Sequence, residues 1–99
     1  MNNTRTNKVE NIDKERIGSL HFKSMDELMD EKDKLQRAID LKIAEKLGNT
    51  HKGKAKIYFN SEEGEFRVET TVWAATEKYI ALKGGVLIPI RSISRVLLA

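Results

Sequence analysis

The spacing of apolar residues along this chain changes near Gly48 and Asn49, from a repeat of three to four residues to an alternation of every second residue. The first spacing is that of one face of an α-helix, and the second is that of a half-buried β-strand. The pattern therefore predicts an α+β fold in which one long N-terminal amphipathic helix, at about residues 25–47, is followed by a sheet at about residues 54–98.

Seven apolar residues of the first segment fall on one arc of a helix. They are Met25, Leu28, Met29, Leu35, Ile39, Ile43 and Leu47. We expect this stripe to be the buried face of the helix, and Leu41, on the opposite side, to be a single exposed leucine. Ser24 and Glu27 have the spacing of a capping box, and Gly48 is the residue type that most often ends a helix in the left-handed conformation.

The remaining N-terminal residues have a weaker pattern. Residues 1–8 are polar and lack a periodic apolar set, which predicts a disordered tail before a single domain at residues 9–99. Sparse apolar positions in residues 9–22 are typical of one short helical turn followed by an extended piece.

The second half of the chain predicts four to five short strands joined by turns. Residues 55–59 alternate, residues 60–64 indicate a hairpin loop, and a long strand follows at residues 66–74. Residues 83–85 indicate a tight hairpin, and Pro89 places its strand at an edge or marks its end. Because so many short strands accumulate twist, we expect a strongly curved antiparallel sheet or a small, partly closed barrel.

Three segments of this half carry a resemblance to a known architecture. They are Gly64–Val72, Tyr79–Lys83 and Val86–Ile90, with Ile93 and Val96 closing the set. This order of a bent long strand, a hairpin and a short terminal strand resembles the small Sm-like and SH3-like β-barrels. The resemblance implies a barrel preceded by a helix, in a ring-forming or nucleic-acid-contacting module. The helix predicted here is much longer than theirs, and no RNA-contact residue of those proteins is assigned to a position of this chain.

A sheet that buries its aliphatic face leaves four large residues on its outer face. These are Tyr58, Trp73, Tyr79 and Leu87. One interpretation is that the apolar stripe of the helix packs on them, and the other is that they form a platform for a ligand. We expect the first arrangement, because apolar stripes at helical spacing are usually core.

The charge of the chain is unevenly distributed. The 99 residues hold 18 Lys and Arg against 15 Asp and Glu, but residues 50–99 hold 8 against 5 and residues 24–49 hold 5 against 7. The sheet half is therefore the basic half, and it combines cations with aromatic rings, as nucleic-acid-binding surfaces do. The candidate nucleic-acid or partner surface is Lys54, Lys56, Tyr58, Arg67, Trp73, Tyr79 and Lys83, with Lys52 at the start of the same strand as Lys54. The same basic surface could instead receive the acidic helix of a second copy.

Catalytic and metal-binding motifs are weak. His21 and His51 each stand alone, without the spacing of a zinc site, and the acidic residues 62–65 lack the calcium-loop pattern. Gly84 and Gly85 lack the context of a phosphate-binding loop. We therefore expect no enzyme activity, no cofactor and no metal site.

The composition predicts a soluble, cytoplasmic protein without membrane contact, because no cysteine, membrane-length apolar run or apolar leader is present. The function predicted is that of a non-catalytic binding or assembly module that interacts with proteins and self-associates through the helix and the sheet edge. The alternative is a nucleic-acid-binding accessory protein that uses the basic and aromatic sheet face.

Overall fold

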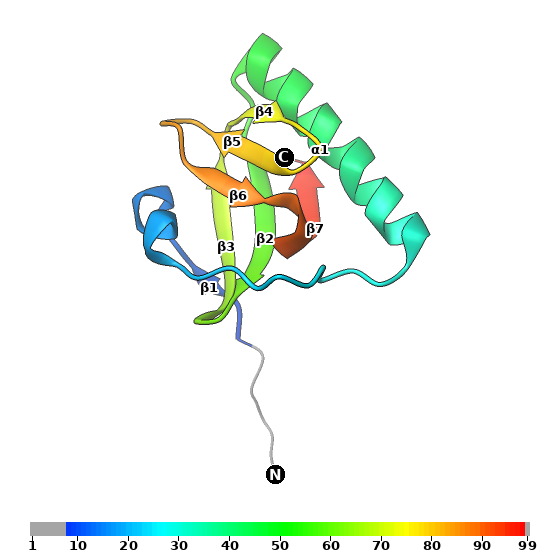
Figure 1. Cartoon of the computed structure of the whole chain (residues 1–99). Helices are drawn as coiled ribbons and strands as arrows, with labels where there is room; N and C mark the ends of the chain where they lie inside the picture. Colours follow the sequence, from blue (N-terminus) through cyan, green and yellow to red (C-terminus); the bar gives the residue numbers. More distant parts are fainter. Residues whose placement is uncertain (1–7, 99) are drawn as a thin grey trace.

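The computed structural model describes residues 8–98, which form two small sheets and one long helix (Figure 1). The elements in chain order are β1 (Glu10–Asn11), the 3₁₀ helix η2 (Lys14–Ser19), α1 (Glu31–His51), β2 (Ala55–Ser61), β3 (Gly64–Thr70), β4 (Val72–Ala75), β5 (Tyr79–Leu82), β6 (Leu87–Pro89), the 3₁₀ turn η3 (Ile90–Ser92) and β7 (Ile93–Leu98). One sheet has the order β1-β3-β2-β7 and the other β4-β5-β6. The predicted disordered tail falls on residues 1–8, of which 1–7 lie outside the described residues.

β2 and the β5–β6 hairpin form where the apolar alternation predicts strands. Every second residue of β2 is buried, from Ala55 to Ser61, and these residues share the core with buried side chains of β3 to β7. Both predicted hairpins are confirmed: β2 and β3 pair as far as Ser61 and Gly64, and the β5–β6 turn contains Gly84 and Gly85 at φ 94° and 89°. Pro89 ends β6, an edge strand, as predicted.

The described chain contains no closed barrel, so the predicted barrel, and with it the barrel implied by the resemblance, is wrong. The predicted long strand is divided at Thr71 into β3 and β4, which belong to different sheets. α1 packs against both β4 and β7. Its side chains bond to their backbones: Glu45 Oε2 accepts from the Ala75 N–H (2.9 Å), Lys42 Nζ donates to the Ala75 carbonyl (2.7 Å), and Arg37 donates to the Ile93 carbonyl (2.9 Å). Side chains of α1 therefore form hydrogen bonds with backbone groups of β4 and β7. These two strands do not pair with each other.

α1 is not N-terminal, and it begins and ends later than predicted. β1, η2 and an extended segment precede it, and the segment crosses the lower edge of the molecule in Figure 1, where the His21 carbonyl accepts from the Glu62 N–H (2.8 Å). The predicted capping box is wrong because the carboxylate of Asp26 accepts from the Leu28 N–H and binds Arg37, which holds the chain in a non-helical turn there. Asp30 caps the helix instead, by accepting from the Lys32 N–H (2.8 Å).

Gly48 does not end the helix. α1 continues to His51, and Lys52 takes the left-handed conformation at its end, with φ 54° and ψ 31°. Gly48 is buried, and a Cβ there would collide with the carbonyl oxygen of Val72 and lie 2.9 Å from Cγ2 of Thr71. The absence of a side chain at Gly48 therefore allows α1 to lie close to the backbone at the start of β4.

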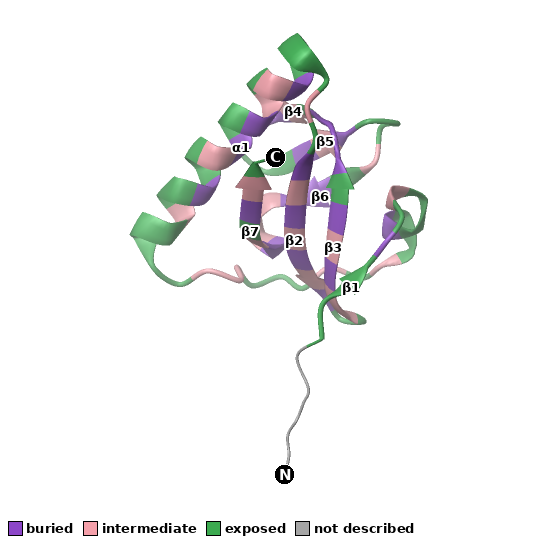
Figure 2. Cartoon of the chain, turned by 180° about the vertical axis from the view of Figure 1, so that it is seen from behind, coloured by how far each residue is buried: buried purple, intermediate pink, exposed green. Residues whose placement is uncertain are grey.

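α1 buries the face opposite to the one predicted. Its buried residues are Arg37, Leu41, Ala44 and Gly48, whereas Met25, Met29, Leu35, Ile39 and Ile43 are exposed (Figure 2). Leu41, predicted to be exposed, is 1% exposed. The reason is that small residues allow the helix to approach β4 closely, while the carboxylate of Asp26 compensates the charge of the buried arginine.

No helix within residues 8–98 is long and apolar enough to cross a membrane.

Candidate binding surfaces

The outer side of α1 carries an apolar stripe without a packing partner in the described chain. Leu35, Ile39 and Ile43, here called the α1 stripe, repeat every fourth residue and are 63%, 45% and 41% exposed. At 100° per residue, Lys32 and Lys46 fall on the same side of the helix as the stripe. The stripe therefore does not cover the outward aromatics of the sheet, and the packing expected from the sequence is wrong.

The outer face of the four-stranded sheet holds a row of polar groups, one from each strand. Tyr58 of β2 stands opposite Arg67 of β3 on one side and Arg95 of β7 on the other, and Arg67 stands opposite Asn11 of β1. Arg67 Nε donates to Asn11 Oδ1 (2.7 Å), and its NH1 donates to the Tyr58 hydroxyl (3.2 Å). Both guanidinium carbons lie over the Tyr58 ring, 5.7 and 5.5 Å from its centre. We call Arg67, Tyr58 and Arg95 the arginine row.

Electrostatics at the arginine row favour anions. The hydrogen bond from Arg67 is the main cause that lowers the pKa of Tyr58 below its usual value of 10.0, and the charges of Arg67, Arg95 and Lys56 act in the same direction. The Tyr58 ring holds two guanidinium groups near one another through cation–π contacts. Guanidinium groups bind phosphate and carboxylate in a bidentate manner, so the row is suited to bind an anion.

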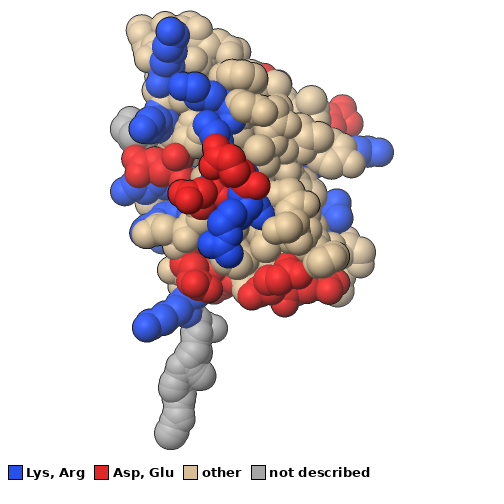
Figure 3. Space-filling model, turned by 90° about the vertical axis from the view of Figure 1, so that its left-hand side faces the viewer, with Lys and Arg blue, Asp and Glu red and all other residues tan. Residues whose placement is uncertain are grey.

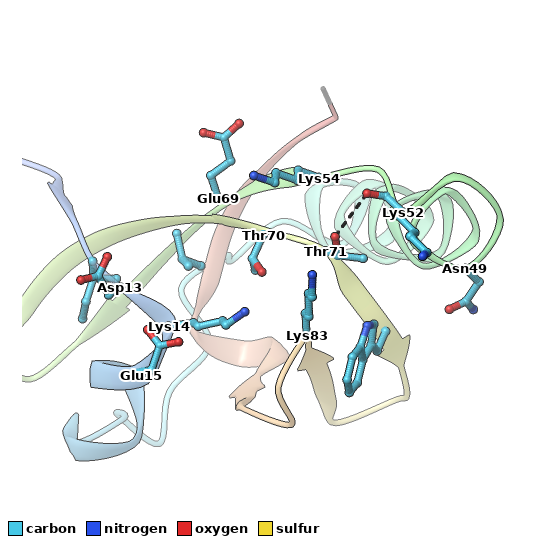
Figure 4. A pocket seen from close by; sticks show the side chains of 14 residues that line it. Asp13, Lys14, Glu15, Asn49, Lys52, Lys54, Glu69, Thr70, Thr71 and Lys83 are labelled. Atoms are coloured by element: carbon cyan, nitrogen blue, oxygen red, sulfur yellow. Dashed lines mark hydrogen bonds between the residues drawn. The ribbon is translucent and has the colours of Figure 1, made fainter.

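A groove of about 700 Å³ lies where the end of α1, the β3–β4 junction, η2 and the β5–β6 turn meet (Figure 4). We call it the basic groove. Its lining residues are Ile12, Asp13, Lys14, Glu15, Gly48, Asn49, Lys52, Lys54, Val68, Glu69, Thr70, Thr71, Trp73 and Lys83. Its volume lies in the range of known ligand pockets, although it is an open groove.

Four lysines from separate segments surround the groove: Lys14, Lys52, Lys54 and Lys83. Figure 4 shows Lys14 extending toward the side where Lys83 rises into the groove, whereas the carboxylate of Glu69 points away from both. None of the four forms an ion pair with a carboxylate within residues 8–98. On the side of the molecule drawn in Figure 3, Lys and Arg lie mainly in the upper left part, while Asp and Glu alternate with them across the middle and lie along the lower edge.

Trp73 lines the basic groove and is 49% exposed. The pairing of β4 with β5 shifts between Val72 and Ala74, so Trp73 is an extra residue without an opposite partner. Such β-bulges redirect a side chain and are frequent beside functional sites. The indole is therefore free to receive a flat ligand, which agrees with the platform interpretation of the outward aromatics.

The structure divides the predicted site residues among three places. Lys54, Trp73 and Lys83 line the basic groove, Tyr58 and Arg67 belong to the arginine row, and Lys56 lies on β2 two residues before Tyr58. Tyr79 is exposed on β5 but does not line the groove. Lys52 lies just after α1, not on a strand.

Sequence reasoning missed two cations of these surfaces. Arg95 joins the row only because β7 pairs with β2, and Lys14 reaches the groove only because η2 lies over the β5–β6 turn, where its Cε is 3.5 Å from the position of a Cβ on Gly84. Both contacts depend on topology, and neither residue stands in a local motif. The alternation around Arg95 could have placed it on an outer face, but not beside Tyr58.

One histidine has a charged partner. His21 Nδ1 lies 2.6 Å from Glu63 Oε2, and the His21 N–H donates to Glu63 Oε1 (2.9 Å). The side-chain contact raises the pKa of His21 above 6.5, and the two hydrogen bonds lower the pKa of Glu63 to about 2. The pair is exposed and does not line the groove, and residues 8–98 contain no group of three potential metal ligands.

Comparisons with protein-family models, with curated proteins and with solved structures found no match to this chain. Only the surfaces described above therefore bear on its function.

Proposed function

We propose that the chain is a non-catalytic protein-interaction module that self-associates through the α1 stripe. The observation that supports this proposal is the exposure of Leu35, Ile39 and Ile43 in a row along one helix. Exposed apolar residues that adjoin one another mark interaction surfaces, whereas scattered ones do not. Exposed Met25 and Met29, just before the helix, add adaptable apolar surface near its start.

The spacing of the stripe suits an antiparallel pair of helices. If a two-fold axis passes Ile39, each residue faces the residue as far on the other side of Ile39 in the second copy. Leu35 then meets Ile43 of the second copy, and Ile39 meets itself, so the apolar positions coincide.

The charges beside the stripe set the strength of such a pair. The same two-fold axis brings Lys32 opposite Lys46 of the second copy. Like charges repel most at low ionic strength, so salt should strengthen the pair. Because the apolar contact is also small, we expect a dissociation constant of roughly 10 to 1,000 µM.

Sedimentation velocity at about 10 µM to about 1 mM protein, in low and high salt, tests this proposal. The unmodified chain should show a dimer that grows with concentration and with salt. Ile39→Lys should abolish the dimer, while Ala38→Lys, which adds the same charge at an exposed position beside the stripe, should weaken it less. A monomer at every concentration and salt would refute self-association.

Lys46→Glu tests the antiparallel arrangement itself. In that arrangement the new carboxylate lies opposite Lys32, so the dimer should tighten by roughly three- to tenfold at low salt and should no longer strengthen as salt rises. Lys78→Glu, outside α1, is the control for net charge. A weaker dimer in Lys46→Glu would contradict the antiparallel pair.

The cytoplasmic location expected from the sequence stays a prediction.

A further inference from the structure

We infer that the basic groove and the arginine row form one continuous binding site for a single-stranded nucleic acid. The site is independent of the α1 stripe. Its evidence is the group of four groove lysines, none of which forms an ion pair within residues 8–98 although Asp13, Glu15 and Glu69 also line the groove, together with the exposed indole at the bulge of β4 and a second concavity that joins the groove to the row.

The continuity of the site rests on shared residues. A second concavity of about 330 Å³ lies beside the groove and is lined by Lys56 and Arg67. Ile12, Asp13 and Glu69 line both hollows. The path therefore runs from Trp73 and Lys83 through the groove to Lys56 and Arg67, and ends at Tyr58 and Arg95.

The repeat of cations along the path suits a polymer of phosphates. Lys54 and Lys56 stand two residues apart, which in a strand is about 6.8 Å, and Tyr58, the next residue on that side, has Arg67 and Arg95 beside its ring. Cations spread along a path match a repeating anion better than they match one small molecule. Phosphate contacts of this kind release counterions and supply affinity without sequence preference.

The aromatic groups at the two ends of the path have different roles. Trp73 is half exposed at a bulge and offers a face on which an unpaired base stacks. The Tyr58 ring already carries a guanidinium on each side, so it holds Arg67 and Arg95 in place for a phosphate. A duplex, whose bases are paired with one another, cannot place a base on Trp73. The site therefore favours a single strand.

A substitution at Lys52 can distinguish an effect on binding affinity from an effect on folding stability. It takes the left-handed conformation, which is strained for a residue with a side chain and relaxed for glycine. Lys52→Gly removes one cation from the groove and relieves the strain, so the variant should keep or raise the thermal midpoint of the chain. Any loss of affinity in this variant comes from the lost charge.

The experiment uses the full chain at about 1 µM, below the concentration at which we expect self-association, and an oligothymidylate of about 12 nucleotides. Trp73 is the sole tryptophan, so its fluorescence reports on stacking. We expect quenching on binding, and a log–log salt dependence with a slope of about −2 to −3, which corresponds to three or four phosphates. The matched duplex should bind roughly tenfold more weakly and leave the fluorescence unchanged.

Variants are compared by the anisotropy of a labelled oligothymidylate. Trp73→Ala should lower the affinity about tenfold, and Lys52→Gly about threefold, because each removes one contact of the path. Lys32→Gln removes the same charge near the start of α1, away from the groove, and should change the affinity little.

Four results would overturn the inference, three of them in direct binding and one in competition. The three in direct binding are no binding at about 20 mM salt, duplex binding as tight as that of the single strand, and an equal loss from Lys32→Gln and Lys52→Gly, which would indicate attraction by net charge alone. Competition by polyglutamate as strong as by unlabelled oligothymidylate would also contradict it, because a peptide polyanion has no base to stack.

Discussion

Arg37 is a charged residue on the buried side of α1, and its partners explain why it can be there. Its guanidinium donates to both carboxylate oxygens of Asp26, at 2.8 and 2.9 Å, and to the carbonyl of Ile93. The main cause that lowers the pKa of Asp26 is this hydrogen bonding. The pair ties the segment before α1, the helix and β7 together.

Asp26→Ala should lower the free energy of unfolding by about 2–3 kcal/mol, because it leaves the Arg37 charge buried without a counterion. Urea denaturation at neutral pH measures this loss. Asp33→Ala, at an exposed helical position, should stay within about 0.5 kcal/mol. The folded pKa of Asp26 is depressed, so its contribution is present above pH 3.8 and is lost as the pH falls further. Equal stability of both variants would contradict a structural role for the pair.

The pair of His21 and Glu63 predicts a dependence on pH at the other end of the extended segment. The raised pKa of His21 makes its contribution complete below pH 6.5 and lost as the pH rises through the folded value. The depressed pKa of Glu63 makes its contribution present above pH 4.5 and lost as the pH falls toward about 2.

The difference in urea midpoint between the unmodified chain and His21→Ala should therefore be largest between about pH 4.5 and 6.5. The His51→Ala variant is the control, because His51 has no ion pair within the described residues. A difference that does not change with pH would show that the pair does not contribute through its charges.

At the scale of elements, α1 shows how small residues decide which face of a helix is buried. Ala44 and Gly48 let the helix approach β4, and Leu41 fills the space between them and Arg37 along the same side. The three residues of the α1 stripe are larger and face solvent. The side of α1 that packs closely against β4 and β7 is therefore the buried one, although the opposite side carries the larger apolar residues.

Gly48→Ala should lower the free energy of unfolding by about 1–3 kcal/mol, although alanine is the better helix former, because its Cβ collides with the Val72 carbonyl. Thermal and urea denaturation measure the change. Asn49→Ala, on the exposed side of the same turn, should be neutral or stabilising. A stabilised Gly48→Ala variant would show that α1 does not approach β4 this closely.

The sequence was sufficient for the two hairpins, but it was insufficient for the division of the long strand between two sheets and for the buried face of the helix. Alternation and the glycines at 84 and 85 identify hairpins because both are local properties. The buried side of α1 depends on Asp26 as the partner of Arg37, a contact across 11 positions, and on the shape of the surface at β4. The arginine row likewise depends on strand order, so Arg95 could not be assigned to it in advance.

At the scale of the whole molecule, α1 packs against β4 and β7, which belong to different sheets, and it turns its larger apolar residues outward. The same arrangement leaves Trp73 uncovered at the end of the helix, beside four lysines. Both proposed activities, self-association and the binding of a single strand, therefore depend on which face of α1 is buried.

Cysteine accessibility tests this dependence most directly, because the chain has no cysteine of its own. Single variants Ile39→Cys and Ala44→Cys are labelled with a thiol reagent at about 1 µM protein, where we expect a monomer. We expect the thiol at position 39 to react nearly as fast as in the unfolded chain, and the thiol at position 44 to react at least about 100-fold more slowly. Fast labelling at position 44 with protection at position 39 would contradict the buried face of α1, and with it the exposed α1 stripe on which self-association depends.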